Sequence, residues 1–217
     1  MLNIKFANGK QVSVEAGTTV YDAAAAAEAI SREVLAATVN GELVGLTTPL
    51  TADSEVKLHT FEDKEGKKVF RHTASHILAQ AVKRLYPEVK LTIGPAVDDG
   101  FYYDFDSDLP FDAAMLTAIE AEMKKIVKEN LKLERFTLPR DEAKKLMEEK
   151  GEPYKVLLID RVPEGEEISF YKQGDFVDLC AGPHLFATGA VKAFKLIQCT
   201  GAYWEGNSKN KTIMIKI

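Results

Sequence analysis

Hydrophobic and polar residues alternate near the start of the chain, over residues 2–6 and again over residues 11–14. The two stretches flank Asn8-Gly9, a dipeptide that favours a tight turn, so the pattern predicts a β-hairpin. Thr19 can then cap a helix that is rich in alanine, the strongest helix former. This helix and the strands expected after it lie near residues 20–30, 35–39 and 55–59.

A hairpin, one helix and returning strands, in that order, predict a small ubiquitin-like β-grasp domain over residues 1–61. The charged stretch EDKEGKK follows at residues 62–68. It has no apolar residue and centres on Gly66, which is typical of an exposed domain boundary. We therefore expect a linker at residues 62–68 and a second, larger domain at residues 69–217.

Apolar residues recur at helical spacing from about residue 69 to residue 86, where Pro87 ends the pattern. Two further helices are expected, a long one at residues 112–130 and a short one at residues 140–150. The sequence also predicts strands at residues 89–93, 101–105, 131–138, 156–159, 168–171, 176–179, 193–197 and 212–217. Few connections are long enough for parallel crossovers, so the expected fold class is α+β with an antiparallel sheet.

The composition is that of a folded globular protein, because 46% of the residues are hydrophobic and 28% are charged. No apolar run approaches the roughly 18 residues of a membrane span. The first residues lack the pattern of a signal peptide, and two cysteines give no disulfide framework. We therefore expect a cytoplasmic protein with no membrane partner. The net charge of −5 gives no general attraction to nucleic acid.

Three of the four histidines fall into two short motifs. His72 and His76 belong to the sequence HTASH, inside the helix expected from residue 69. A spacing of four residues places both imidazoles on one helical face, where they can converge on one atom or one substrate. Thr73 stands where a metalloprotease helix carries a glutamate, so the pair does not match that motif.

The second motif, CAGPH, begins at Cys180 and ends at His184. Its Gly-Pro step favours a turn, which presents the thiol and the imidazole from a tight bend. Together with His72 and His76 these residues are the ligand types of a zinc site. They equally supply general acids and bases near neutral pH. Cys180 has a third interpretation, as a nucleophile activated by a histidine. The residues by themselves leave these alternatives open.

Four motifs follow one another along the chain: HTASH at 72–76, GFYYD at 100–104, DLCAGPH at 178–184 and TGAYW at 200–204. This series resembles the editing domain of threonyl-tRNA synthetases, which is similar to the editing module of alanyl-tRNA synthetases. The preceding residues resemble the small β-grasp domain, called TGS, at the start of the same enzymes. The resemblance covers essentially the whole chain in the same order.

The resemblance implies an aminoacyl-tRNA ester hydrolase that removes serine attached by mistake to the tRNA for threonine. Serine lacks only one methyl group of threonine, and a pocket discriminates a missing methylene by only about 10 to 200-fold. A second, smaller pocket can exclude threonine by bulk while the seryl ester enters. Nothing in the chain resembles the ATP site of a full synthetase, so we do not expect it to charge tRNA. Part of a synthetase and a freestanding editing protein are both open.

The resemblance implies catalytic roles for His72, His76, Lys155, Asp178, Cys180 and His184. His72 and His184 are expected to activate a water or a ribose hydroxyl. Lys155 is expected to stabilise the developing negative charge. Asp178 is expected to orient the substrate amine or a histidine.

The expected partner is the acceptor end of tRNA(Thr) carrying serine, and a local basic stretch supports it. Residues 186–217 contain five lysines against one acid, and Arg71, Lys83 and Arg84 of the predicted helix add to this rim. Such a rim suits a phosphate backbone. Aromatic residues can stack on a terminal base. The residues expected to contact substrate are Arg71, Tyr103, Tyr203 and Trp204.

We expect no bound metal, because the threonyl type in this resemblance works by positioned water. The alternative is zinc at His72, His76, Cys180 and His184, the four residues equivalent to those that hold zinc in the alanyl relative. A second class of function is a regulatory module that binds RNA or a nucleotide and holds a structural zinc. If the chain is part of a synthetase, the remaining synthetase domains are further partners.

Overall fold

The computed structural model describes residues 1–97, 99–203 and 211–216, with their side chains up to Gly201. It has the mixed α+β arrangement that the sequence predicts. The chain divides into two compact units, Met1–Thr73 with Gly182–Phe186 and Ala74–Ala181 with Ala187–Ile217. The domain limits of 1–61 and 69–217, which concern what folds independently, stay predictions.

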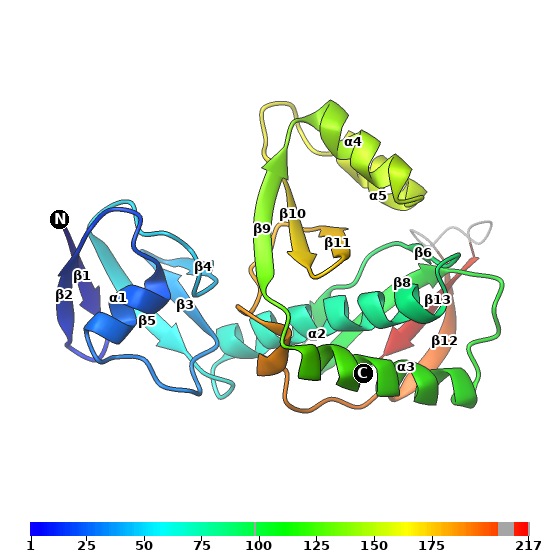
Figure 1. The fold of residues 1–217 in the computed structure, drawn as a ribbon, viewed down its shortest axis with the longest axis horizontal. Helices are drawn as coiled ribbons and strands as arrows, with labels where there is room; N and C mark the ends of the chain where they lie inside the picture. The colour runs from blue at the N-terminus through cyan, green and yellow to red at the C-terminus, as the bar shows by residue number, and fades with distance from the viewer. Residues whose placement is uncertain (98, 204–210, 217) are drawn as a thin grey trace. The chain divides into compact units, whose positions relative to one another are not determined.

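The first unit contains a five-stranded sheet in the order β2-β1-β5-β3-β4, with one helix (Figure 1). Its elements are β1 (Leu2–Phe6), β2 (Gln11–Val14), α1 (Val20–Ala26), β3 (Ala36–Val39), β4 (Glu42–Val44) and β5 (Ser54–His59). β1 and β5 run parallel, whereas the other pairs are antiparallel. This is the predicted β-grasp arrangement.

Alternation along β1 explains how this sheet buries one face. Ile4 and Phe6 are buried in the core with the small residues of α1, whereas Asn3 and Lys5 are exposed. Thr19 caps α1 as predicted, because its hydroxyl oxygen accepts a hydrogen bond from the Asp22 amide at 3.1 Å. Such a cap is worth about 1 kcal/mol. The helix ends at Ala26, earlier than the predicted residue 30.

Helix α2 (Lys64–Leu85) begins earlier than the predicted residue 69, so most of the expected linker is helical. Lysine and glutamate are good helix formers, and the stretch contains several of them. Gly66 serves close packing there. A Cβ at this position would lie 1.9 Å from the carbonyl oxygen of Thr60.

The second unit contains two antiparallel sheets, in the orders β11-β10-β9 and β12-β13-β8-β6, with β7 paired to β8. The antiparallel pairing agrees with the predicted fold class. Its elements after α2 are β6 (Lys90–Leu91), β7 (Ala96–Val97), β8 (Gly100–Asp106), α3 (Ala113–Glu129), β9 (Leu133–Leu138), α4 (Arg140–Glu149), α5 (Pro153–Asp160), β10 (Ile168–Gln173), β11 (Phe176–Leu179), the 3₁₀ turn η1 (Thr188–Ala190), β12 (Gln198–Tyr203) and β13 (Lys211–Lys216).

Helices α4 and α5 cover one face of the β9–β10–β11 sheet (Figure 1), with a shared core that includes Met147, Ile159 and Phe170. The strand predicted at residues 156–159 is wrong, because these residues belong to α5. Pro153 is at the start of this helix, where its missing N–H is not needed.

The strand predicted at residues 193–197 is also wrong, since the strand in this region begins at Gln198. The amide of Leu196 instead donates to the carboxylate of Glu120 on α3, at 3.1 Å. Across the part of the chain that the structure describes, no helix combines the length and the apolar character needed to cross a lipid bilayer.

Candidate active site

A buried polar cluster lies inside the second unit, where Tyr103 of β8, Lys155 of α5 and Asp178 of β11 come together. Nζ of Lys155 is 2.7 Å from Oδ1 of Asp178. The Tyr103 hydroxyl donates to Oδ2 of Asp178 at 2.7 Å and accepts from Nζ of Lys155 at 2.9 Å. None of the three residues is more than 3% exposed. The sequence places two of these residues in its predicted catalytic set and the third beside the pocket, and the structure brings them together.

His76 of α2 is also in contact with this cluster. Its Nε2 lies 3.8 Å from Oδ2 of Asp178, and the residue is 3% exposed. Asp178 therefore has an ammonium group, a phenol and an imidazole around it. The role of Asp178 in orienting the substrate amine or a histidine stays a prediction.

The surroundings change the proton affinities inside the cluster. Burial raises the pKa of Asp178, but the charges of Lys155 and His76 together with the hydrogen bonds from Lys155 and Tyr103 outweigh burial, so the pKa is lowered overall. Burial, together with the charge of Asp178, raises the pKa of Tyr103 well above its usual value. The cluster therefore holds a carboxylate beside a neutral phenol across the physiological range.

Local packing fixes the ring of Tyr103. A Cβ added to Gly94 would lie 2.1 Å from Cδ2 of this ring, so only glycine fits there. The hydroxyl of Ser75 on α2 holds the Gly94 carbonyl by a hydrogen bond of 2.8 Å. Neither Gly94 nor Ser75 is singled out by the sequence patterns.

Cys180 follows β11, is partly exposed and is not part of a disulfide. Its backbone is fixed to Ser169 of β10, by an N–H to carbonyl bond of 3.0 Å and by the Ser169 hydroxyl, which donates to the Cys180 carbonyl at 2.8 Å. The ligand atoms of Cys180 and His76 lie within 4.8 Å of one another. Activation of this thiol by a histidine stays a prediction.

In the first unit, His72 and His184 form a stacked pair with ring centroids 4.1 Å apart and planes inclined by 28°. Nδ1 of His72 donates to the carbonyl of Pro183 at 3.2 Å. A carbonyl oxygen only accepts, so this bond places the hydrogen on Nδ1 and leaves the lone pair on Nε2. His72 therefore has the tautomer that a general base requires.

Thr73, between the two histidines of HTASH, fixes the second ring of this pair. Its hydroxyl oxygen lies 3.1 Å from Nδ1 of His184 and accepts from the amide of Leu185 at 2.9 Å. Thr73 is fully buried. From the sequence, Thr73 showed only that the helix lacks the glutamate of a metalloprotease motif. Its contact with the His184 ring was found only in the structure.

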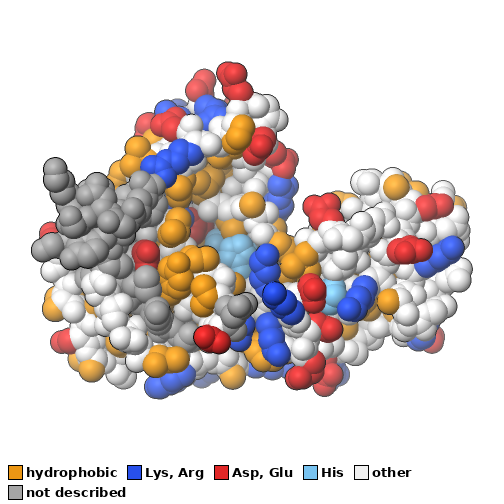
Figure 2. All heavy atoms as spheres, turned by 180° about the vertical axis from the view of Figure 1, so that it is seen from behind, with side chains coloured by type: hydrophobic (Ala, Val, Ile, Leu, Met, Phe, Trp, Pro, Cys, Tyr) orange, Lys and Arg blue, Asp and Glu red, His pale blue; other side chains and the backbone are white. Residues whose placement is uncertain are grey.

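The two sequence motifs, HTASH and CAGPH, each hold their two candidate side chains a few residues apart. His72 and His76 are one turn apart on α2, which is helical from Lys64 to Leu85. Cys180 and His184 belong to one five-residue segment, in which Gly182 has a φ of 81°. Figure 2 shows histidine atoms at the surface among hydrophobic side chains. Among the described residues, His72, His76, Cys180 and His184 are the group with the donor types for a metal ion.

Of the other residues expected to contact substrate, the structure describes the side chain of Arg71 but not those of Tyr203 and Trp204. Arg71 precedes His72 on α2 and is half-buried. Trp204 lies outside the described residues, and Tyr203 ends β12 with its side chain outside the description. Three cations of the predicted basic rim form ion pairs within the protein: Lys83 pairs with Glu152, whereas Arg84 and Lys195 pair with glutamates of α3.

Two family models match parts of the chain. The TGS domain matches residues 3–60, and the threonyl and alanyl tRNA synthetase second additional domain matches residues 168–214. The second match contains Asp178, Cys180 and His184. The chain thus contains a segment similar to a TGS domain, followed by a segment similar to this additional domain.

Comparison with whole proteins narrows this similarity. The chain is 58% identical over 214 residues to the threonine–tRNA ligases of Clostridium tetani and Clostridium kluyveri, and 57% identical over 211 residues to that of Caldanaerobacter subterraneus subsp. tengcongensis. These alignments cover 97 to 98% of this chain but only 33 to 34% of the relatives. The chain resembles the N-terminal region of threonine–tRNA ligases and spans about a third of their length.

Proposed function

We propose that this chain hydrolyses the ester between serine and the tRNA for threonine, and so removes wrongly attached serine. The observation that carries the proposal is the buried Lys155–Asp178 pair beside His76, in a chain similar to threonine–tRNA ligases. A buried lysine can stabilise the negative charge that develops in ester hydrolysis, and a histidine beside a carboxylate can transfer protons. The substrate class is the one that the resemblance implies.

The proposed reaction adds water to the carbonyl carbon of the seryl ester and breaks its bond to the ribose oxygen. Nε2 of His72 takes a proton from the attacking water, and the departing ribose oxygen receives a proton, which yields serine and tRNA. His184 is proposed to hold the water or a ribose hydroxyl beside His72. The covalent alternative, attack by the thiol of Cys180, stays open.

Lys155 is proposed to stabilise the negative charge that develops on the carbonyl oxygen. An ammonium group has three N–H donors. Two of them are directed at Asp178 and Tyr103, which hold the group in place. A preorganised charge in a site that excludes water stabilises the transition state more than the same charge in water does.

The reaction as proposed needs no resident metal, although the four donors fit zinc by type. Tetrahedral zinc needs ligand atoms roughly 3.3 to 3.8 Å apart, with lone pairs that converge on one point. The rings of His72 and His184 are stacked, with centroids 4.1 Å apart and planes inclined by 28°. If zinc is bound, these histidines with His76 and Cys180 would hold it, and it would polarise the ester or the water.

The test is deacylation of tRNA(Thr) charged with serine or with threonine, followed for both esters. We expect loss of the seryl ester only, and a large loss of rate in Lys155→Met. Glu122→Gln is the control, since it neutralises a buried carboxylate that pairs with Lys125 and Arg84. Absence of seryl hydrolysis, or equal loss of both esters, contradicts the proposal.

A second candidate function is the regulatory module with a structural zinc, which the donor set favours. It predicts RNA or nucleotide binding with bound zinc and without hydrolysis. The partners proposed for the chain are the seryl-tRNA(Thr) acceptor end and the remaining domains of a threonine–tRNA ligase. Retention of tRNA with no loss of the ester would select the regulatory module.

A further inference from the structure

Helix α2 continues the face of His76 with two more polar residues, Gln80 and Lys83. Spacings of four and seven residues keep all three side chains on one side of the helix. Each has a partner on a different element of the second unit. The pairs are His76–Asp178 at 3.8 Å, Gln80–Gln173 at 2.8 Å and Lys83–Glu152 at 2.7 Å. We call these three pairs the polar ladder.

The middle pair joins α2 to the end of β10 in both directions. The amide group of Gln173 donates to Oε1 of Gln80 at 2.8 Å and to the carbonyl of His76 at 3.3 Å. The amide group of Gln80 donates to the carbonyl of Gln173 at 3.2 Å. Both glutamines are at most 2% exposed. Because β10 pairs with β11, this contact sets where Asp178 lies relative to His76.

The third pair fixes the start of α5, the helix that carries Lys155. Glu152 precedes α5, yet its side chain makes no capping hydrogen bond to that helix. One oxygen pairs with Lys83, and the other accepts from the amide of Leu91 at 2.7 Å. Lys155 follows three residues later in the first turn. The Lys83–Glu152 pair therefore sets the position of the Lys155 ammonium group.

Lys83 is itself held by more than one contact. Its ammonium group also donates to the carbonyls of Pro87 and Val89, at 2.7 and 2.9 Å. The ammonium group therefore makes two hydrogen bonds to carbonyls and an ion pair with Glu152. Replacement of Lys83 by an apolar residue therefore removes the ion pair with Glu152 and the contacts with the Pro87 and Val89 carbonyls.

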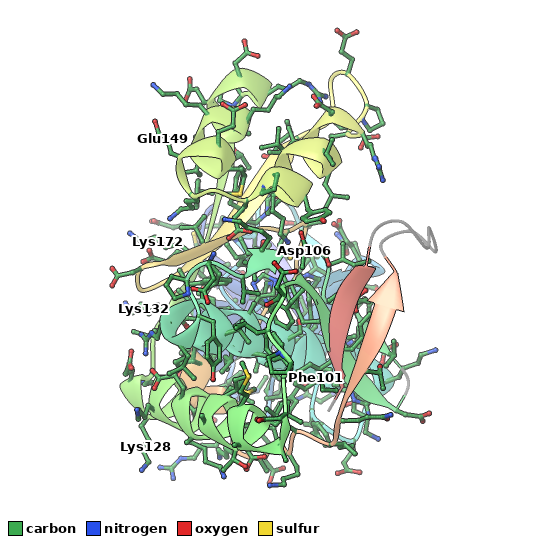
Figure 3. The ribbon with its side chains drawn as sticks, turned by 90° about the vertical axis from the view of Figure 1, so that its right-hand side faces the viewer. Phe101, Asp106, Lys128, Lys132, Glu149 and Lys172 are labelled. Atoms are coloured by element: carbon green, nitrogen blue, oxygen red, sulfur yellow. The ribbon has the colours of Figure 1, made fainter. Side chains whose placement is uncertain are left out.

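An open pocket of about 270 Å³ lies beside the ladder and is lined by Gln80, Lys83, Glu152 and Phe176, among others. Because the pocket is open to solvent, close apolar packing does not support the ladder residues on that side. In the first turn of α5, next to Lys155, the Tyr154 hydroxyl donates to Asp106 at 2.9 Å. Figure 3 shows Asp106 on the side of β8 toward α4 and α5.

We propose that Gln80, Lys83, Glu152 and Gln173 are positioning residues for seryl ester hydrolysis. They act through Lys155, Asp178 and His76, and they do not contact the substrate. This inference rests on the proposed function. A displacement of about 1 Å at the reacting groups can cost about 100-fold in rate, so loss of a ladder pair slows the chemical step more than it weakens binding.

The test uses single-turnover and steady-state deacylation of seryl-tRNA(Thr) by the full chain. Lys83→Met is expected to lower kcat about tenfold or more with KM changed less than about twofold, and Lys83→Arg is expected to restore most of the rate. In a Lys155→Met background, Lys83→Met is expected to have little further effect, because the two residues act as one unit. Glu122→Gln is the control that leaves kcat unchanged.

The outcomes separate the inference from the proposed function. If the wild-type chain hydrolyses neither ester, the proposed function fails and the inference fails with it. Two results would overturn only the inference when the wild type is active. In the first, the folded Lys83→Met variant keeps the wild-type kcat. In the second, Lys83→Met lowers the rate by the same factor in the Lys155→Met background as in the wild type. Gln80→Met, which removes a neutral pair, replaces Lys83→Met in the same assay if the latter does not fold.

Discussion

Lys155 and Asp178 form an ion pair with 2.7 Å between Nζ and Oδ1, although their side chains are only 4% and 2% exposed. The cost of removing two charges from water makes such a pair a weak source of net stability. Removal of one partner is different, because it leaves a buried charge without compensation. The pair therefore makes this region sensitive to single substitutions, independently of any reaction.

Asp178→Asn is the first prediction. It leaves the Lys155 ammonium group buried without a counter-charge, and we expect the free energy of unfolding to fall by about 3 to 5 kcal/mol. Glu167→Gln is the control, since it removes an exposed ion pair with Arg135 and should cost about 1 kcal/mol or less. Urea unfolding of both variants at pH 7 measures the difference. Equal losses in the two variants would contradict the prediction.

A second prediction concerns Asp104 and pH. Burial raises the pKa of Asp104 to about 6, and its Oδ1 has no hydrogen-bond partner among the described residues. The folded state then holds this proton more tightly than the unfolded state, so the contribution of Asp104 becomes unfavourable as the pH rises from about 4 through about 6.

Asp104→Asn resembles the protonated form and removes this effect. We expect the variant to have a higher Tm than the wild type at pH 8, and the two proteins to converge as the pH falls to about 4. Thermal unfolding between pH 4 and pH 8 provides the test. A difference that does not depend on pH would mean that the titration of Asp104 is not its source.

Gly94→Ala is the third prediction. The new methyl group would lie 2.1 Å from the ring of Tyr103, and a buried ring that must move also breaks its contacts with Lys155 and Asp178. We expect a loss of about 1 to 3 kcal/mol in unfolding free energy and a strong loss of seryl-tRNA deacylation. The stability control is Gly201→Ala, where no atom of the described side chains lies within 4 Å of the new Cβ. Full deacylation by Gly94→Ala would show that the Tyr103 ring need not stay in place.

The fourth prediction concerns metal. We expect protein purified without chelator to contain well under one zinc per chain, and prolonged dialysis against EDTA to leave the rate of seryl ester hydrolysis unchanged. Metal analysis and the same deacylation assay give the two readouts. One equivalent of zinc, lost together with activity and restored with it, would replace the water mechanism by a zinc site at His72, His76, Cys180 and His184.

Local patterns predicted the elements that depend on neighbours in sequence. The hairpin of the first unit, the cap at Thr19 and the helix that carries His72 and His76 all follow from turn chemistry, capping and periodicity over a few residues. The same local reasoning gave a wrong strand at residues 156–159, which belong to α5. A short apolar run is compatible with a buried strand and with a buried helix, so it cannot distinguish the two. The signal for Gln80 and Lys83 was present, because they lie on the helical face of His76.

The sequence by itself determined the β-grasp and α+β classes, the spacing of the histidines and, through its motifs, the family resemblance. Only the tertiary structure decided which groups contact one another: Asp178 with Lys155, Tyr103 and His76, and Glu152 with Lys83. These partners lie far apart in sequence, and no periodicity links them. Their pairing depends on how helices and strands pack, because a buried charge is stable only where a distant element supplies its counter-charge.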